Sequence, residues 1–503
     1  MSTCRESGLA LLLLALLPVL PAAVAEEGTR RPNILFLFAD DQRPDTVAAY
    51  GNRFIKTPHI DRLVRSGFSF NHAYCMGSIH GAVCQPSRAM LMTGRTLWRV
   101  PMNLKGVPLM PDVLARSGYV TFGTGKWHNG AASFERAFQH GRSVFIGGMS
   151  DHTRVPLRDL AADGKLTRPR STNRFSSEIF ADAMIEFLEG RAGKTDKPFF
   201  AYAAFTSPHD PRQPPEKFAR MYAPGNAKLP LPRNFMPQHP FHNGWMVGRD
   251  EALAAWPRTR RVIRSQLGEY YGMISHLDEQ VGRILAAVDK SGHADNTIIV
   301  YTADHGLAVG SHGLLGKQNL YEHSMGTPMV VVGPGIPSGK SSDALVYLYD
   351  LFPTICSWTG VRVPEAVEGR SLAGVITGAK PFVRESLFTA YEDKMRAVRD
   401  ERFKLIRYPQ INHTQLFDLE KDPDELKNLA EQPGQSARVQ EMMGLLARWQ
   451  RQTADKTPHT SKNPKPMDID LTGRKRTPDR HQPKWIIEKY FDSQPNTRPR
   501  KKS

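Results

Sequence analysis

Short apolar runs alternate along the chain with longer stretches in which apolar residues recur at helical spacing. Uninterrupted apolar runs of this kind are typical of strands that are buried on both faces of a sheet. Such strands are predicted at residues 33–38, 119–122, 199–205, 297–302 and 328–332. Between them, helices are predicted at residues 177–188 and 261–288. The pattern therefore predicts an α/β fold in which helices flank a large, mixed but mostly parallel sheet.

The pattern changes after about residue 378. Short strands are predicted at residues 386–390, 395–399, 403–408 and 415–419, followed by a helix near residues 437–451. Closely spaced strands are typical of an antiparallel meander. We therefore expect a main domain at residues 26–378 and a small antiparallel subdomain at residues 379–451 that packs against the main sheet.

The first 25 residues resemble a secretory signal peptide. Arg5 precedes an apolar segment at residues 9–20, and Ala23-Val24-Ala25 has the form of a cleavage site. The alternative is an uncleaved anchor, although the segment is short for a membrane span. We expect cleavage and export to the periplasm, the medium or an equivalent lumen. The mature chain would keep three cysteines, so at least one thiol stays unpaired or takes part in chemistry: Cys75, Cys84 and Cys356.

The chain is strongly basic, with 67 Lys and Arg against 50 Asp and Glu and a net charge of +17. Of this charge, +7 lies in the extension at residues 452–503, where 13 basic residues face 6 acidic ones. One interpretation is a solvated, partly disordered extension, and another is attraction to polyanions such as sulfated polysaccharide. Residues 485–491 are apolar enough to dock onto the body. Nucleic acid is not expected as a partner, because no nucleic-acid-binding motif is present.

Polar residues cluster where the predicted strands end. Asp40-Asp41 follow the first strand, Lys126 and His128 the second, His209 the third, and Asp304-His305 the fourth. In α/β sheets ligands bind at the carboxyl ends of the strands, so these residues predict a single site. The carboxylates Asp40, Asp41 and Asp304 suit calcium or magnesium better than zinc.

Arg88, Lys126 and Lys317 would add several positive charges to such a site. Cations that face a metal indicate an oxyanion substrate such as a sulfate or phosphate ester. The segment Gly123-Thr124-Gly125-Lys126 is not a P-loop, because Trp127 stands where Ser or Thr is required.

The most specific segment is Cys84-Gln85-Pro86-Ser87-Arg88, followed by Thr93-Gly94-Arg95. At this segment the chain resembles the type I sulfatases of the alkaline phosphatase superfamily, whose motif is C-x-P-S-R with a downstream T-G-R. The other polar positions agree with that family in order and kind, and the resemblance covers residues 32–451.

The resemblance implies that Cys84 is oxidised after translation to formylglycine by a formylglycine-generating or sulfatase-maturating enzyme. It implies that the hydrated aldehyde, with one bound calcium ion, attacks sulfur and forms a covalent sulfo-enzyme. The implied calcium ligands are position 84 and four further residues, Asp40, Asp41, Asp304 and His305, of which His305 replaces the Asn of many relatives.

The remaining roles are also implied by the resemblance. Arg88 would hold the diol, and Lys126 and Lys317 would grip the sulfate oxygens. His209 would protonate the leaving alcohol and His128 would act as base, although these two roles are interchangeable at this stage. The less specific histidines that could line the pocket are His72, His80 and His323.

Three functions stay open from the sequence. The first is an exported sulfatase that acts on sulfated polysaccharide or glycosaminoglycan sugars. The second is a phosphatase or phosphonate hydrolase of the same superfamily, although such enzymes usually have Ser or Thr in place of Cys84. The third is a catalytically silent protein that binds polyanions.

Overall fold

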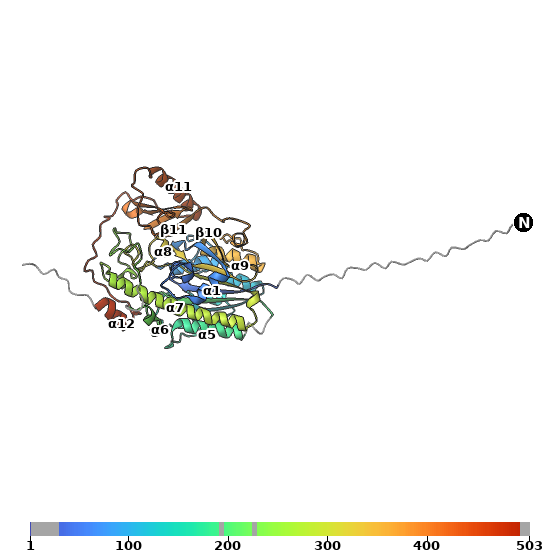
Figure 1. Ribbon diagram of the computed structural model, residues 1–503. Helices are drawn as coiled ribbons and strands as arrows, with labels where there is room; N and C mark the ends of the chain where they lie inside the picture. The colour runs from blue at the N-terminus through green and yellow to red at the C-terminus, as the bar shows by residue number, and fades with distance from the viewer. Residues whose placement is uncertain (2–29, 191–195, 224–228, 493–503) are drawn as a thin grey trace, which may run out of the picture. The chain divides into compact units, whose positions relative to one another are not determined.

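The computed structural model describes Met1 and residues 30–190, 196–223 and 229–492. The predicted signal peptide after Met1 lies outside the described residues. The described residues from Arg31 on form one compact unit (Figure 1). None of the helices in the described ranges combines the length and the apolar character that a membrane span requires.

The large sheet contains the apolar runs predicted from the sequence. Its strands follow the order β10 (Lys340–Tyr347), β2 (Phe68–Tyr74), β9 (Met329–Val332), β7 (Thr297–Ala303), β1 (Asn33–Asp40), β6 (Phe199–Pro208), β4 (Val120–Lys126) and β5 (His140–Phe145). The short β8 (Gly326–Thr327) pairs with β2. The neighbours β7, β1, β6, β4 and β5 are parallel, whereas β9 is antiparallel to both β7 and β2. The predicted mixed, mostly parallel sheet is therefore confirmed.

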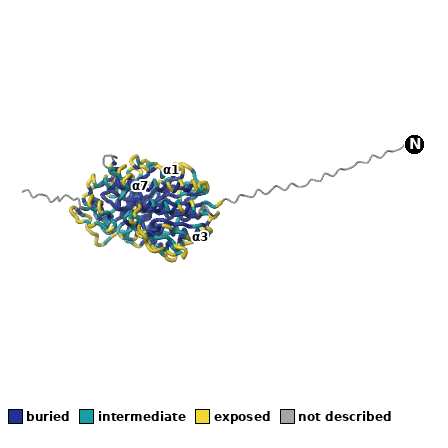
Figure 2. The backbone as a smooth tube through the Cα atoms, turned by 90° about the horizontal axis from the view of Figure 1, so that it is seen from below, coloured by how far each residue is buried: buried dark blue, intermediate teal, exposed yellow. Residues whose placement is uncertain are grey.

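Alternate residues of the central strands pack into two separate cores. In β1, Leu35 and Leu37 face the helices α1 (Pro58–Ser66), α5 (Ser176–Glu189) and α7 (Arg260–Lys290). Phe36 and Phe38 face the opposite core, which contains residues of α2 (Cys84–Thr93), α3 (Met110–Arg116), α4 (Ala131–Ala137) and α9 (Leu351–Thr359). Figure 2 shows the buried residues concentrated in the interior of the unit. This two-faced burial explains why β1 is apolar without alternation.

The second sheet contains the predicted antiparallel strands, in the order β14 (His413–Asp418), β13 (Phe403–Tyr408), β12 (Met395–Arg399), β11 (Leu387–Tyr391) and β3 (Gly77–Ser78). The last of these lies far away in the sequence and pairs in parallel with β11, so the small sheet is tied to the main part of the chain. The helix α11 (Ser436–Thr453) packs beside it. The remaining short helices are α6 (Glu216–Met221), α8 (Glu322–Met325), α10 (Ala373–Ile376) and α12 (Lys484–Ile487).

Residues 452–492 are largely exposed, as expected of a solvated extension, but parts of this segment dock onto the body, the alternative that the sequence left open for residues 485–491. This segment runs from α11 along the body to α12, near α7 (Figure 1). Leu471, Ile486 and Tyr490 are buried, and Asp455 forms an ion pair with buried Arg396. The extension packs because its apolar residues and several of its charged residues find partners on the body. Residues 493–503 lie outside the described residues.

Candidate active site

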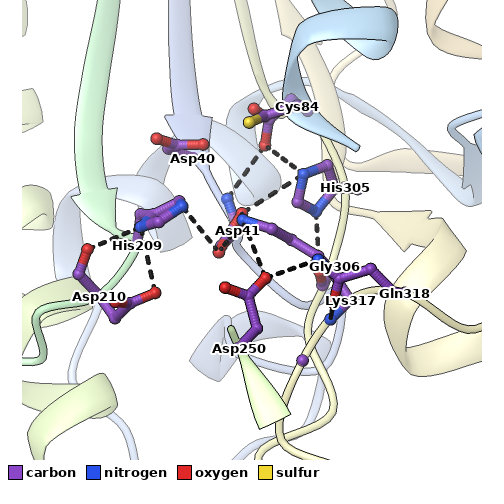
Figure 3. A network of polar contacts seen from close by, with 12 residues as sticks. Asp40, Asp41, Cys84, His209, Asp210, Asp250, His305, Gly306, Lys317 and Gln318 are labelled. Carbon is purple, nitrogen blue, oxygen red and sulfur yellow. Dashed lines mark hydrogen bonds and ion pairs between the residues drawn. The ribbon is translucent and has the colours of Figure 1, made fainter. Parts of the chain in front are cut away.

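Four neighbouring strands deliver the predicted polar residues to one edge of the large sheet. Asp40 ends β1 and Lys126 ends β4, while Asp304-His305 follow β7 and His209 follows β6. Because these strands are parallel, their carboxyl ends meet at the same edge. The structure therefore brings the predicted strand-end residues together, and Figure 3 shows several of them in one network.

Gly125 explains part of the glycine-rich segment before Lys126. Its φ of 86° lies in the left-handed region, and a Cβ atom would meet the Ala204 carbonyl oxygen of β6 at 1.8 Å. The glycine is thus required for the close approach of β4 to β6, which sets the position of Lys126.

Helix α2 begins at Cys84, and the next residues of the motif fix its first turn to the strand ends. Ser87 Oγ donates to the carbonyl oxygen of Asp304 at 2.7 Å. Arg88, 1% exposed, donates from Nε to Asp304 Oδ2 at 3.1 Å and from Nη1 to the Lys126 carbonyl oxygen at 2.9 Å. Ser87 and Arg88 therefore hold Cys84 at the end of the sheet.

Three buried carboxylates form the centre of the site. Asp40, Asp41 and Asp304 each place one oxygen within 4.8 Å of the others. Burial raises the pKa of Asp41 well above its ordinary value; Lys317 opposes this shift, and Asp40 and Asp304 add to it. Burial would also raise the pKa of Asp304, but His305, Arg88 and Lys126 outweigh it and lower this pKa. Such a cluster of buried carboxylates is stabilised by added positive charge.

The donor set fits a hard divalent cation. Among the described residues, Asp40 Oδ1 and His305 Nε2 are buried atoms without a hydrogen-bond partner. His305 Nδ1 donates to the Gly306 carbonyl oxygen at 2.9 Å, so Nε2 faces the carboxylates and lies 3.3 Å from Asp41 Oδ1. Cys84, Asp304 and His305 form a second group whose ligand atoms lie within 4.8 Å of one another. Oxygen-rich sets of this kind suit calcium or magnesium.

Lys126 and His128 flank the Cys84 thiol. Lys126 Nζ lies 2.5 Å from Asp40 Oδ2 and 3.6 Å from Cys84 Sγ. His128 Nδ1 lies 3.3 Å from the same sulfur. His128 has a φ of 69° and Asp41 a φ of 68°, both in the left-handed region, where residues other than glycine are uncommon. Strained backbone of this kind concentrates at functional sites.

Lys317 and His209 stand on the other side of the carboxylates. Lys317 Nζ contacts both Asp41 oxygens, at 2.8 and 2.9 Å. His209 Nδ1 donates to the Asp210 carbonyl oxygen at 2.7 Å, so Nε2 faces the site, 3.8 Å from Asp41 Oδ2. Burial lowers the pKa of His209 well below its ordinary value, and Lys317 adds to the shift. Burial and then Lys126 lower the pKa of His128 in the same way.

A further layer of residues was not predicted from the sequence. Asp250 lies 4.0 Å from Lys317 Nζ and accepts from Gln318 Nε2 at 2.7 Å. Arg249 forms ion pairs with Asp210, Asp250 and Asp479. Gln482 of the extension donates to Asp210 Oδ2 at 3.1 Å. Arg249, Asp250 and Gln482 lie on irregular segments without a strand-end pattern, so the sequence offered no signal for them.

The three less specific histidines, His72, His80 and His323, lie at different places relative to the site. His323 is buried against His312 and Tyr321, and His72 lines a separate cavity with Glu322 and Asp343. His80 lies closer to the site: burial lowers its pKa, and His128 adds to the shift. Cys75 and Cys356 are free, buried thiols.

A sequence model of the sulfatase family matches residues 32–361. The chain belongs to the sulfatase family. It is a sulfuric ester hydrolase, as the sequence motif predicted. A second model, described as the C-terminal part of N-sulphoglucosamine sulphohydrolase, matches residues 310–452.

Curated relatives of this sulfatase match along most of their length. An N-acetylglucosamine-6-O-sulfatase of Bacteroides thetaiotaomicron is 27% identical over 86% of this chain and 88% of the relative. An arylsulfatase of Clostridium perfringens is also 27% identical, over 83% of this chain and 94% of the relative.

Solved structures show the same fold. A protein solved in complex with its substrate D-glucosamine-2-N,6-O-disulfate has a TM-score of 0.72 at 24% identity, covering 86% of this chain and 100% of that one. A phosphonate monoester hydrolase of Silicibacter pomeroyi has a TM-score of 0.67 at 23% identity, covering 85% and 96%. The predicted alkaline-phosphatase-like fold is therefore confirmed.

Proposed function

We propose that this sulfatase is an exported, calcium-dependent enzyme that removes sulfate from sugars of polysaccharides or glycosaminoglycans, with residue 84 in the formylglycine form. The observation that carries the proposal is the placement of Cys84 at the start of α2, with Sγ 3.3 Å from His128 Nδ1 and 3.6 Å from Lys126 Nζ. In this position the sulfur stands for the oxygen atoms of a hydrated aldehyde, which would supply the nucleophile.

Asp40, Asp41, Asp304 and His305 would hold the calcium ion, together with position 84. Bound there, calcium would make a hydroxyl at position 84 more acidic and would offset the charge of the carboxylates. Asp40 Oδ1 and His305 Nε2, which lack hydrogen-bond partners among the described residues, support this assignment.

The other side chains would act directly on the sulfate ester. Lys126 and Lys317, buried and cationic, would contact the sulfate oxygens and stabilise the charge that builds on them during transfer. His128 would accept a proton from position 84, because its lowered pKa favours the neutral ring. Its Nδ1 lies 3.3 Å from Cys84 Sγ, within reach of that proton. Arg88 would hold the side chain of residue 84 in place.

His209 would donate the proton that the leaving alcohol requires when the S–O bond breaks. Its Nδ1 is occupied by the Asp210 carbonyl oxygen, so the donor is Nε2, in the cationic form. A bound sulfate ester brings negative charge close to this ring, which favours that form. The ion pair of Asp210 with Arg249 helps to fix the ring from behind.

A sugar sulfate is the substrate class that agrees with the names of the relatives and with the positive net charge of this chain. The relatives include an N-acetylglucosamine-6-O-sulfatase and a Delta 4,5-hexuronate-2-O-sulfatase, 27% and 28% identical to this chain. The net charge of +17 would attract polyanionic chains. A desulfation assay over a panel of defined sulfated mono- and oligosaccharides tests the proposal: turnover of aryl sulfates alone would contradict it.

Phosphonate or phosphate ester hydrolysis is the second candidate. It is favoured by the likeness to the phosphonate monoester hydrolase and by 26% identity to a multifunctional alkaline phosphatase superfamily protein of Trinickia caryophylli. Parallel assays with nitrophenyl sulfate, nitrophenyl phosphate and a phosphonate monoester separate the two. The sulfatase proposal requires the highest kcat/KM for the sulfate.

Export and maturation form the last part of the proposal. The composition of residues 1–25 supports cleavage after Ala25, and the Cys84 motif supports recognition by a formylglycine-generating or sulfatase-maturating enzyme. N-terminal sequencing of the protein from its own cells tests the first point. A mature chain that still begins at Met1 would contradict it.

A further inference from the structure

The extension at residues 452–492 encloses a pocket of about 280 Å³ beside the site. Four basic side chains line it and one acidic side chain opposes them: Arg249, Arg474, Lys475, Arg476 and Asp479. Trp256 and Phe491 supply apolar walls. The sequence showed the basic run at residues 474–476 only as part of a charged tail, whereas the structure concentrates it around one cavity.

The charges of this pocket are incompletely neutralised. Asp479 is bound to Arg249, which also pairs with Asp210 and Asp250. Within the part of the chain that the structure describes, no ion pair joins Arg474, Lys475 or Arg476 to an acidic group. The pocket therefore presents net positive charge.

Two buried donors of the pocket walls lack acceptors. Among the described residues, Trp256 Nε1 and Arg476 Nη1 have no hydrogen-bond partner, and the Trp256 side chain belongs to a residue that is only 4% exposed. Burial lowers the pKa of Arg476, and no acidic neighbour counteracts the shift. Buried N–H donors without partners are costly, and an oxyanion would satisfy them.

The pocket shares a wall with the catalytic centre. Arg249 lines the pocket and donates from Nη1 to Asp210 Oδ1 at 3.0 Å and to Asp250 Oδ1 at 2.7 Å. Asp210 lies 3.3 Å from His209 Nδ1, and Asp250 lies 4.0 Å from Lys317 Nζ. Figure 3 shows Asp210 beside His209 and Asp250 beside Lys317. Arg249 and Asp210 therefore stand between the pocket and His209, and a substrate chain that extends from Cys84 past His209 towards Arg249 would reach the pocket.

We propose that this pocket binds a second oxyanion of the substrate, a sulfate or a carboxylate on a sugar next to the one that is desulfated. The inference rests on the proposed function, since it assumes a polyanionic saccharide at the catalytic centre. It assigns the extension a role in selecting polyanionic over singly charged substrates.

The test compares two pocket variants with a matched control. Arg474→Ala/Lys475→Ala removes two exposed charges, and Arg476→Gln removes the partly buried one. Lys456→Ala/Lys462→Ala removes two exposed charges of the same extension outside the pocket. The assay is inhibition of nitrophenyl sulfate turnover by a heparin-derived oligosaccharide, by a uronate oligosaccharide without sulfate, and by inorganic sulfate.

We expect both pocket variants to raise the inhibition constant of the sulfated oligosaccharide about tenfold, as for loss of a charged hydrogen bond. The control variant should change it far less, and the constant for inorganic sulfate should stay unchanged in all variants. A matching rise for the uronate oligosaccharide would assign the pocket to carboxylates as well as sulfates.

If the control variant raised the inhibition constant of the sulfated oligosaccharide as much as the pocket variants do, the binding would be general charge attraction and the proposed pocket would be wrong. An unchanged inhibition constant in the pocket variants would also contradict the proposal. A rise for inorganic sulfate would mean that the substitutions act on the catalytic centre itself, which also contradicts a separate pocket. Calorimetric titration with the same oligosaccharides makes the comparison without turnover. Binding to the pocket can therefore be measured even if the wild-type protein does not turn over a sulfate ester, so the two proposals can fail independently.

Discussion

Asp455→Ala should destabilise the whole compact unit, because Asp455 ties the extension to the small sheet. Its carboxylate accepts from Arg396 Nε at 2.6 Å and from Arg396 Nη2 at 3.0 Å, and the two side chains are 0% and 1% exposed. Gln450 Nε2 donates to the same carboxylate at 2.7 Å. The substitution would leave the Arg396 guanidinium buried without its counter-charge.

Breaking a buried ion pair in this way costs about 3–5 kcal/mol. The compact unit begins at Arg31, and for a domain of this size the unfolding entropy of about 2 cal/mol/K per residue converts the loss to a fall in Tm of about 3–5 °C. Differential scanning calorimetry measures this shift. Asp468→Ala removes an exposed acidic residue of the same extension and should leave Tm unchanged.

The pH dependence gives this experiment a second readout. Burial would raise the pKa of Asp455, but the hydrogen bond and charge of Arg396 outweigh it and lower the pKa. The pair therefore stabilises the fold above the ordinary pKa of Asp and loses that contribution as pH falls through the lowered value. The difference in Tm between wild type and Asp455→Ala should shrink in acid. Equal melting of Asp455→Ala and Asp468→Ala at neutral pH would refute the packed extension.

Three further predictions concern the site and the fold. Asp304→Asn removes a charge from the carboxylate cluster, so the calcium concentration that restores half activity after chelation should rise at least about tenfold; an unchanged requirement would contradict its role as ligand. His209→Gln should lower kcat about 10²–10⁴-fold on sugar sulfates but much less on nitrophenyl sulfate, whose leaving group needs no proton; equal losses would exclude His209 as the donor. Burial raises the pKa of Asp278 to about 7, although backbone N–H groups of Ile60 and His59 oppose the shift. Wild-type Tm should therefore fall as pH rises from the ordinary pKa of Asp towards 7, and Asp278→Asn should flatten this slope. A variant with the wild-type slope would show that Asp278 does not titrate in this range.

The central strands and the residues at their ends could be predicted from the sequence, because burial on both faces requires uninterrupted apolar runs. β1 and β6 are buried along their whole length, and both were predicted. β2 and β10 were missed, because exposed polar residues interrupt their apolar pattern near the edge of the sheet. The Cys84 motif identified the site because it combines several rare residues in a fixed spacing.

The outer layer of the site could not be predicted, because it depends on contacts between distant segments. Arg249 and Asp479 are 230 positions apart in the chain and meet at 2.9 Å. Composition predicted a solvated extension, because net charge does not show which of its charged residues form contacts with the body. Gln482, which reaches Asp210, lies in that same extension.

The measurement that tests the central claim most directly is mass spectrometry of the peptide that contains residue 84, from protein purified from its own cells. Conversion of Cys84 to formylglycine removes one sulfur and two hydrogen atoms and adds one oxygen, and the aldehyde should react with a hydrazine reagent. We expect this species in the active fraction, and Cys84→Ala should lose sulfatase activity while keeping the wild-type Tm. An active enzyme in which Cys84 remains an alkylatable thiol would contradict the account.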